Sequence, residues 1–409
     1  MHKGVKIALD PSPVQIVLLR KHTGTARFVY NHLLAYIQEE YDKGNKVSTN
    51  FYQLRKHWNS VKAEAAPWWN ECSKEAASYG CESLSRAFAN FFEGRKSGRE
   101  VGYPRFKSKN RCRPAFAYTT GSFGAIEDDP YGLKFPKIGR IHTFENVHHR
   151  LKGAKVIRMT ITEEGGRWYA SLTAEADFFK LAKETGQKVG VDLGIRQLAV
   201  LSDGTVYENP KHLARSERKL KREQKSLSRK QRGSNRYDRQ RRKVNRLHAR
   251  IRHQREDRIH KMTTDMTEKY DEIVIEDLYV KGMVRNHRLA KAISDAGFGK
   301  IRQQLEYKCA QRGRKLTVIK RFEPTSKKCS HCGHVKTKLA LSERTYICEA
   351  CGMVMDRDLN AAINILAAGS ASEAENGRGE NARPALPADL YEASTRQSLE
   401  LSLATGHEN

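Results

Sequence analysis

Three acidic residues in the second half of the chain stand where carboxylates could hold metal ions. The two-residue period of a strand places Gly190, Asp192 and Gly194 on one face, which we expect to be bare enough for ions and a phosphate to approach. Glu276 ends an apolar strand, and Asp358 stands where the last helix begins. Three convergent carboxylates can hold a pair of Mg²⁺ ions, one activating a water and the other stabilising the leaving oxygen of a phosphodiester.

Each acid also has an ordinary structural interpretation: a turn Asp, a solvated strand end, or a helix N-cap. Asp356, two residues before Asp358, could equally be the third ligand. We expect Leu359, Ile363 and Leu366 to form the buried stripe of this helix, since they recur at i, i+4 and i+7. That stripe places Asp358 at the edge of the core and leaves Asp356 to cap the helix.

Four cysteines have the spacing of a zinc site. Cys329-x-x-Cys332 and Cys348-x-x-Cys351 are separated by 15 residues, the arrangement of a zinc ribbon, with two redox motifs as the alternative. Four thiolates leave no open position on Zn²⁺, so the predicted role is structural. The other cysteines are expected to be reduced thiols: Cys72, Cys81, Cys112 and Cys309.

The charge of the chain predicts a polyanionic partner. The formal net charge is +28, and residues 211–261 hold 21 Lys and Arg against 5 Asp and Glu. Such a single-sign excess favours contact with a phosphate backbone over a merely solvated surface. The run Gly102-Tyr-Pro-Arg-Phe-Lys107 could contact nucleic acid or pack inside a barrel. The candidate backbone contacts are Arg239, Arg241, Arg242, Lys243, Arg105 and Lys107.

No run of about 18 apolar residues occurs, and the first ten residues lack the apolar stretch of a secretory signal. We therefore expect a cytoplasmic protein with no membrane partner.

The elements around these residues predict a multidomain α+β protein. Strand patterns enclose a helical block in the first half, which fits a β-barrel carrying a helical lobe. The second half alternates strands, the last of them at 316–322, with a long basic helical hairpin at residues 211–269 and a helix at 294–312. The expected parts are a barrel (1–10 and 99–186), a helical lobe (11–98), an α/β domain (187–322 and 353–368), a cysteine module (323–352) and a disordered tail (369–409).

Several runs resemble the signatures of the TnpB family, and they occur in that family's order over residues 1–368. They are Gly24-Thr-Ala-Arg-Phe-Val-Tyr-Asn-His32, Gly102-Tyr-Pro-Arg-Phe-Lys107, Gly190-Val-Asp-Leu-Gly194, Ile275-Glu-Asp-Leu278, Ile293-Ser-Asp-Ala-Gly-Phe-Gly299, the double CxxC and Asp356-Arg-Asp-Leu-Asn-Ala-Ala-Ile-Asn-Ile365.

The resemblance implies a wedge β-barrel with a helical recognition lobe, followed by an RNase H-like RuvC nuclease domain that contains a zinc ribbon. It implies a guide RNA from the transposon end, a double-stranded DNA target beside a short motif, and a single nuclease site at Asp192, Glu276 and Asp358. Two Mg²⁺ ions and one Zn²⁺ are then expected, in a monomeric protein.

Two other functions remain open. A nuclease-silent RNA-guided repressor would lack at least one of the three acids, all of which are present. A transposase that performs strand transfer also needs an acidic metal site, so the three acids do not exclude it.

Overall fold

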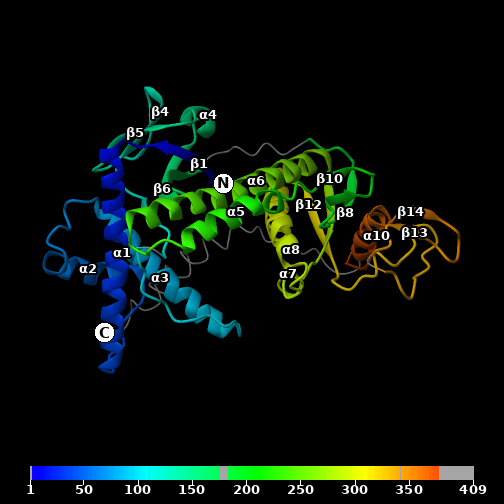
Figure 1. The fold of residues 1–409 in the computed structure, drawn as a ribbon, viewed down its shortest axis with the longest axis horizontal. Coiled ribbons are helices and arrows are strands. Elements are labelled where there is room, and N and C mark those ends of the chain that lie inside the picture. Colours follow the sequence, from blue (N-terminus) through cyan, green and yellow to red (C-terminus); the bar gives the residue numbers. More distant parts are fainter. Residues whose placement is uncertain (1, 110, 176–182, 341, 377–409) are drawn as a thin grey trace. The chain divides into compact units, whose positions relative to one another are not determined.

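A computed structural model describes residues 2–109, 111–175, 183–340 and 342–376. The chain divides into two compact units, Met1–Phe178 with Ser226–Ala249, and Phe179–Lys225 with Arg250–Asn409. The outer part of the basic hairpin therefore belongs to the first unit, whereas the sequence suggested that the whole hairpin belongs to the second half. Figure 1 shows the elements of both units.

An antiparallel seven-stranded sheet forms the first unit's larger core. Its order is β2-β6-β7-β1-β5-β4-β3. A Cβ added to Gly124 of β3 would lie 3.5 Å from the Cβ of Val156 in β6. The two ends of the sheet therefore curl towards each other. The strands are β1 (His2–Asp10), β2 (Ala115–Tyr118), β3 (Gly124–Ile126), β4 (Asp129–Phe135), β5 (Gly139–Thr143), β6 (Lys155–Glu164) and β7 (Arg167–Glu175). The predicted strand and helix pattern of this half is confirmed.

Three long helices make a second core in the same unit. They are α1 (Pro13–Asp42), α2 (Phe51–Ala65) and α3 (Lys74–Lys96), and a short helix α4 (Val147–Leu151) accompanies the sheet. Ser12 begins α1 with a capping box completed by Gln15. Leu33, Leu84 and Phe88 are buried between these helices. This is the helical block that the sequence predicts.

A mixed five-stranded sheet organises the second unit, in the order β10-β9-β8-β11-β12. The strands are β8 (Lys188–Asp192), β9 (Gln197–Leu201), β10 (Val206–Glu208), β11 (Glu272–Glu276) and β12 (Lys315–Ile319). Strand β11 runs parallel to both β8 and β12, whereas β9 is antiparallel to β8. The carboxyl ends of β8, β11 and β12 therefore meet at one edge, where ligand sites form in sheets of this kind.

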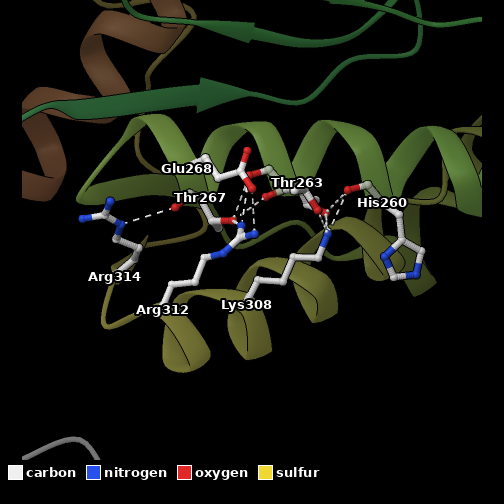
Figure 2. Close-up of polar contacts among 8 residues, drawn as sticks. His260, Thr263, Thr267, Glu268, Lys308, Arg312 and Arg314 are labelled. Atoms are coloured by element: carbon white, nitrogen blue, oxygen red, sulfur yellow. Dashed lines mark hydrogen bonds and ion pairs between the residues drawn. The ribbon is translucent and has the colours of Figure 1, made fainter. Parts of the chain in front are cut away.

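Three longer helices lie between the strands of this sheet in the chain: α5 (His212–Ser228), α6 (Asn235–Lys269) and α9 (Phe298–Arg312). Buried polar contacts join α6 to α9. Figure 2 shows the Lys308 ammonium of α9 pointing at α6, where it donates to the Thr263 and Thr264 hydroxyls at 2.7 Å each and to His260 O at 2.8 Å. Burial lowers the pKa of Lys308 to about 8. These contacts hold the C-terminal part of α6 against α9.

Three expected element boundaries were wrong. The expected helix at 294–312 is two helices, α8 (Ala290–Ala296) and α9, because Gly297 between them has a φ of +73°. Strand β12 ends at Ile319 and not at residue 322. Helix α10 (Arg357–Asn376) extends eight residues into the expected disordered tail; the rest of that tail, 377–409, lies outside the described residues.

The remaining described elements are the short helix α7 (Val280–Met283) and the β13 (Thr345–Ile347) and β14 (Val354–Asp356) pair beside the cysteines. None of the helices described is long and apolar enough to cross a bilayer.

Candidate active site and cysteine cluster

Two of the predicted acids lie at the ends of neighbouring parallel strands. Asp192 is the last residue of β8, and Glu276 is the last residue of β11. The register pairs Ile275 with Val191, so Glu276 and Asp192 are the next residues along the two strands. Between its charged first residue and the acid, each strand is uncharged and buried, and the acids stand at the strand ends. The structure thus brings together two acids that are 84 residues apart in the sequence.

Helix α10 brings the third acid to the same edge. A Cβ on Gly190 would lie 2.2 Å from Ala362 O and 2.9 Å from Leu366 Cβ, so α10 lies directly on this face of β8 (Figure 1). Asp358 is one helical turn before Ala362 and shares its face of α10. Asp192, two residues beyond Gly190, shares Gly190's face of the strand.

The expectation that Gly190 leaves this face open to ions was therefore wrong, because α10 covers it. The glycine instead permits the close approach of the helix that carries Asp358. The expected stripe of α10 was also wrong: Leu359, Ile363 and Leu366 are only half-buried. The fully buried face is made by smaller residues and two amides, because the helix packs so close to the sheet. Its members are Asn360, Ala361, Ala362, Asn364, Ile365 and Gly369.

The three acids are electrostatically coupled. Burial, reinforced by the negative charges of Glu276 and Asp358, raises the pKa of Asp192 to about 7. Burial also raises the pKa of Glu276, opposed by a hydrogen bond from Thr325. Two neighbouring carboxylates that resist ionisation together are stabilised by a cation between them.

Asp356 and Asp358 have different partners. Asp356 Oδ1 accepts the backbone N–H groups of Asp358 at 2.9 Å and Leu359 at 3.1 Å, which is the geometry of a helix N-cap. Asp358 lies 3.4 Å from Arg357 Nε and its side chain is 15% exposed. The predicted capping role of Asp356 is confirmed by these contacts, and Arg357 pairs with Asp358.

A loop before the first CxxC pair joins the site, and sequence reasoning missed it. The Thr325 hydroxyl donates to Glu276 Oε1. Asn364 Nδ2 donates to Thr325 O at 2.9 Å and to Lys328 O at 2.6 Å. Asn360 and Asn364 are buried four residues apart on α10. In the sequence, the spacing of Asn360 and Asn364 among alanines could have indicated a buried polar contact of this helix. No sequence pattern indicated the role of Thr325.

The cysteine cluster fits a tetrahedral metal. Cys329 Sγ lies 3.7 Å from Cys351 Sγ, and Cys332 Sγ lies 3.6 Å from Cys348 Sγ. Four sulfurs bound to zinc at about 2.3 Å stand about 3.8 Å apart. Backbone N–H groups of Cys351 and Ala350 lower the pKa of Cys348 to about 6, whereas burial and the neighbouring sulfurs raise the pKa of Cys351 to about 12, as expected for close thiols that share protons when no metal is bound.

In the part of the chain that the structure describes, the ligand atoms of these cysteines all lie within 4.8 Å of one another, and the three acids form no group that tight.

The residues predicted to contact a nucleic-acid backbone differ in how exposed they are. Arg239, Arg242 and Lys243 are exposed, whereas Arg241 is half-buried and lies 3.1 Å from Asp238. Lys107 Nζ lies 3.8 Å from the centre of the Tyr30 ring, and burial lowers the pKa of Lys107. Arg105 of the same run is exposed.

Three segments of the chain match family models. Residues 172–287 match OrfB_IS605, described as "Probable transposase". Residues 298–365 match the "Cas12f1-like, TNB domain", and residues 1–46 match the "Helix-turn-helix domain" of the OrfB_IS605 group. In the structure, that last segment is strand β1 followed by the single helix α1.

A relative from Streptomyces pristinaespiralis named "Putative RNA-guided DNA endonuclease" is 37% identical, covering 93% of this chain and 92% of its own. The similarly named InsQ of Escherichia coli K12 is 32% identical, covering 93% and 96%. A cryo-EM structure of a Cas12f1-sgRNA-target DNA complex covers 90% of this chain and 99% of the Cas12f1 chain at 16% identity. The TM-score of this match is 0.34. Identity and coverage at the level of the first two relatives show that the chain belongs to the TnpB family, also called OrfB_IS605.

Proposed function

We propose that the chain is an RNA-guided DNA endonuclease that hydrolyses phosphodiesters with divalent metal at a single RuvC-type site. The observation that carries this proposal is the meeting of Asp192, Glu276 and Asp358 at one sheet edge, where the pKa of Asp192 is raised to about 7 by burial and the other two acids. The names of the relatives that match nearly the whole chain support the RNA-guided part of the proposal.

The donor set suits Mg²⁺, which prefers carboxylate oxygens. Asp192, Glu276 and Asp358 would hold a pair of ions. When bound, the ions would activate a water and stabilise the departing oxygen. The chain's own contribution is to fix the acids: two end parallel strands, one lies on a helix packed against Gly190, and Thr325 holds Glu276.

The arrangement of the second unit supports an RNase H-like domain. An antiparallel set, β10-β9-β8, is extended by the parallel strands β11 and β12, and α10 covers β8. Within it, residues 323–352 would form a zinc ribbon with one structural Zn²⁺ on Cys329, Cys332, Cys348 and Cys351. The curled sheet of the first unit would be the wedge barrel, and α1–α3 the recognition lobe.

Specificity would come from pairing between a guide RNA of the transposon end and target DNA beside a short motif, a division of labour known for another class of RNA-guided effectors. The basic hairpin would bind phosphates in a sequence-independent way. The protein would act as a monomer on double-stranded DNA in the cytoplasm.

The test is cleavage of a plasmid by the purified protein with its copurified RNA. We expect Mg²⁺-dependent double-strand breaks at one place, set by the RNA sequence, and none with Asp192→Asn. Joining of DNA ends without RNA would instead identify a strand-transfer enzyme. RNA-directed DNA binding without cleavage in the wild-type protein would identify a repressor.

A further inference from the structure

The loop between β12 and Cys329 contacts the candidate active site through one side chain. Thr325 is 3% exposed, and its hydroxyl donates to Oε1 of Glu276. Glu276 is the last residue of β11. It lies one residue beyond Ile275, the last residue of β11 that pairs with β8. A hydrogen bond to one carboxylate oxygen restrains rotation of the group and leaves the second oxygen available to a cation.

The same loop is fastened to the helix that carries Asp358. Asn364 donates to Thr325 O and Lys328 O at 2.9 and 2.6 Å, and Asn360 donates to Lys328 O at 2.8 Å. Asn360 Oδ1 also accepts the backbone N–H of Ser330, at 2.9 Å, inside the first CxxC pair. Buried amides that are hydrogen-bonded in this way favour one geometry, because a shift would break these bonds and leave polar groups unpaired.

We propose that Thr325 is a positioning residue for Glu276, and that Asn360 and Asn364 tie this position to helix α10 and to the first cysteine pair. Two of the three acids would then be set by one rigid connection: Asp358 lies on α10, and Glu276 is held by a loop bound to α10. The inference rests on the proposed function, in which Glu276 binds a catalytic ion.

The physical effect is on metal affinity. A freely rotating glutamate must be ordered when the ion binds, which costs conformational free energy that Thr325 has already offset in the folded protein. Hydrogen bonds that orient metal ligands change affinity by about 10- to 100-fold when removed. Loss of the Thr325 hydroxyl should therefore raise the Mg²⁺ requirement without affecting nucleic-acid binding.

The chain offers a matched control at the other end of β11. The Thr317 hydroxyl donates to Glu272 Oε1 at 2.9 Å, a second Thr–Glu hydrogen bond between β12 and the first residue of β11. Thr317→Val removes the same type of interaction away from the site. Thr325→Ser keeps the hydroxyl and removes only a methyl group.

The experiment compares Thr325→Val, Thr325→Ser and Thr317→Val as complexes with guide RNA. We expect Thr325→Val to need about tenfold more Mg²⁺, or more, for half-maximal cleavage. At saturating Mg²⁺ its rate should approach that of the wild type, and Thr325→Ser and Thr317→Val should behave as the wild type. Asn364→Leu should shift the requirement in the same direction as Thr325→Val.

A second measurement does not depend on cleavage. Mn²⁺ binding to the full-length chain without RNA, followed by electron paramagnetic resonance, should be weakened by Thr325→Val and not by Thr317→Val. Unchanged Mg²⁺ and Mn²⁺ dependence in Thr325→Val would overturn the inference, as would equal impairment in Thr325→Ser. Glu276→Gln separates the two levels: if it cleaves normally, the proposed site is wrong, and if it is inactive while Thr325→Val is normal, only the positioning role is wrong.

Discussion

Gly190 of β8 lies directly beneath Ala362 of α10, so close that a Cβ on the glycine would stand 2.2 Å from the Ala362 carbonyl oxygen. Backbone is the obstacle here, and it cannot rotate away as a long side chain could. The distance between helix and strand is therefore fixed by the absence of one carbon atom. Because Asp192 is on β8 and Asp358 is on α10, the same packing sets how near these acids come.

Gly190→Ala should destabilise the protein and impair cleavage. Forcing an extra carbon into a packed interface costs about 1–3 kcal/mol, and backbone crowding places this site at the upper end. Thermal denaturation and Mg²⁺-dependent cleavage measure the two effects. Gly299→Ala is the control in the same unit, because nothing lies within 4 Å of the Cβ it would add. Wild-type melting and activity in Gly190→Ala would contradict the close packing.

The metal-free protein should become more stable when Asp192 loses its charge. Folding raises the pKa of Asp192 from 3.8 to about 7, so between these values the folded state binds more protons than the unfolded state. The free energy of unfolding therefore falls as pH rises through this window, and the cost remains above pH 7. At about 1.4 kcal/mol per pKa unit, the cost is at most about 4 kcal/mol.

Asp192→Asn removes that cost. The measurement uses magnesium-free buffer without a chelator, because a chelator would remove zinc. The melting temperature of Asp192→Asn should exceed that of the wild type at pH 8, and this difference should be smaller at pH 5.5. Asp271→Asn is the control of opposite sign, because Asp271 accepts the Thr185 and Gly186 backbone N–H groups at 2.9 and 2.7 Å and its pKa is lowered. If Asp192→Asn is less stable than the wild type at pH 8, ionised Asp192 does not destabilise the folded protein.

The cysteine cluster should bind one zinc ion per chain. Cys329→Ser should lose the zinc, because three thiolates bind it less tightly than four. Metal analysis of freshly reduced protein by mass spectrometry measures the ratio. Cys112→Ser, whose thiol lies outside the cluster, should keep the zinc. Wild-type protein free of zinc, or a full zinc content in Cys329→Ser, contradicts the assignment.

The sequence predicted what local pattern determines and missed what packing determines. Short apolar runs predicted β8 and β11, and the CxxC spacing predicted the sulfur cluster that the structure forms. The role of Gly190 was misread, since only tertiary structure shows that a helix more than 160 residues later covers it. Thr325 was invisible for the same reason: its partners Glu276 and Asn364 are 49 and 39 residues away.

The basic hairpin should bind phosphates through counterion release. Replacing Arg239, Arg241, Arg242 and Lys243 with Gln should flatten the slope of log K against log salt by about 0.9 for each DNA phosphate that the hairpin no longer neutralises. The exposed members should contribute most, since Arg241 is paired with Asp238. Asp238→Asn removes an acid from the same helix and should not flatten the slope. An unchanged slope in the fourfold variant means that this part of the hairpin is only a solvated surface.

The two acids at the start of α10, Asp356 and Asp358, should have different functions. After burial and Glu276, Asp358 raises the pKa of Asp192 more than Asp356 does, and only Asp356 accepts the backbone N–H groups of Asp358 and Leu359 as an N-cap. Asp358→Asn keeps the shape but loses the charge that would hold a cation, so we expect it to abolish Mg²⁺-dependent cleavage and leave guide-dependent DNA binding nearly intact. Asp356→Asn should remain active, because asparagine caps helices as well as aspartate does, while Asp356→Ala should lose about 1 kcal/mol of stability.

Cleavage time courses, DNA binding and thermal denaturation of the three variants decide between the acids. Full activity in Asp358→Asn, or loss of cleavage in Asp356→Asn with normal folding, would place the third ligand on Asp356, and α10 would then have to begin in a different orientation over β8.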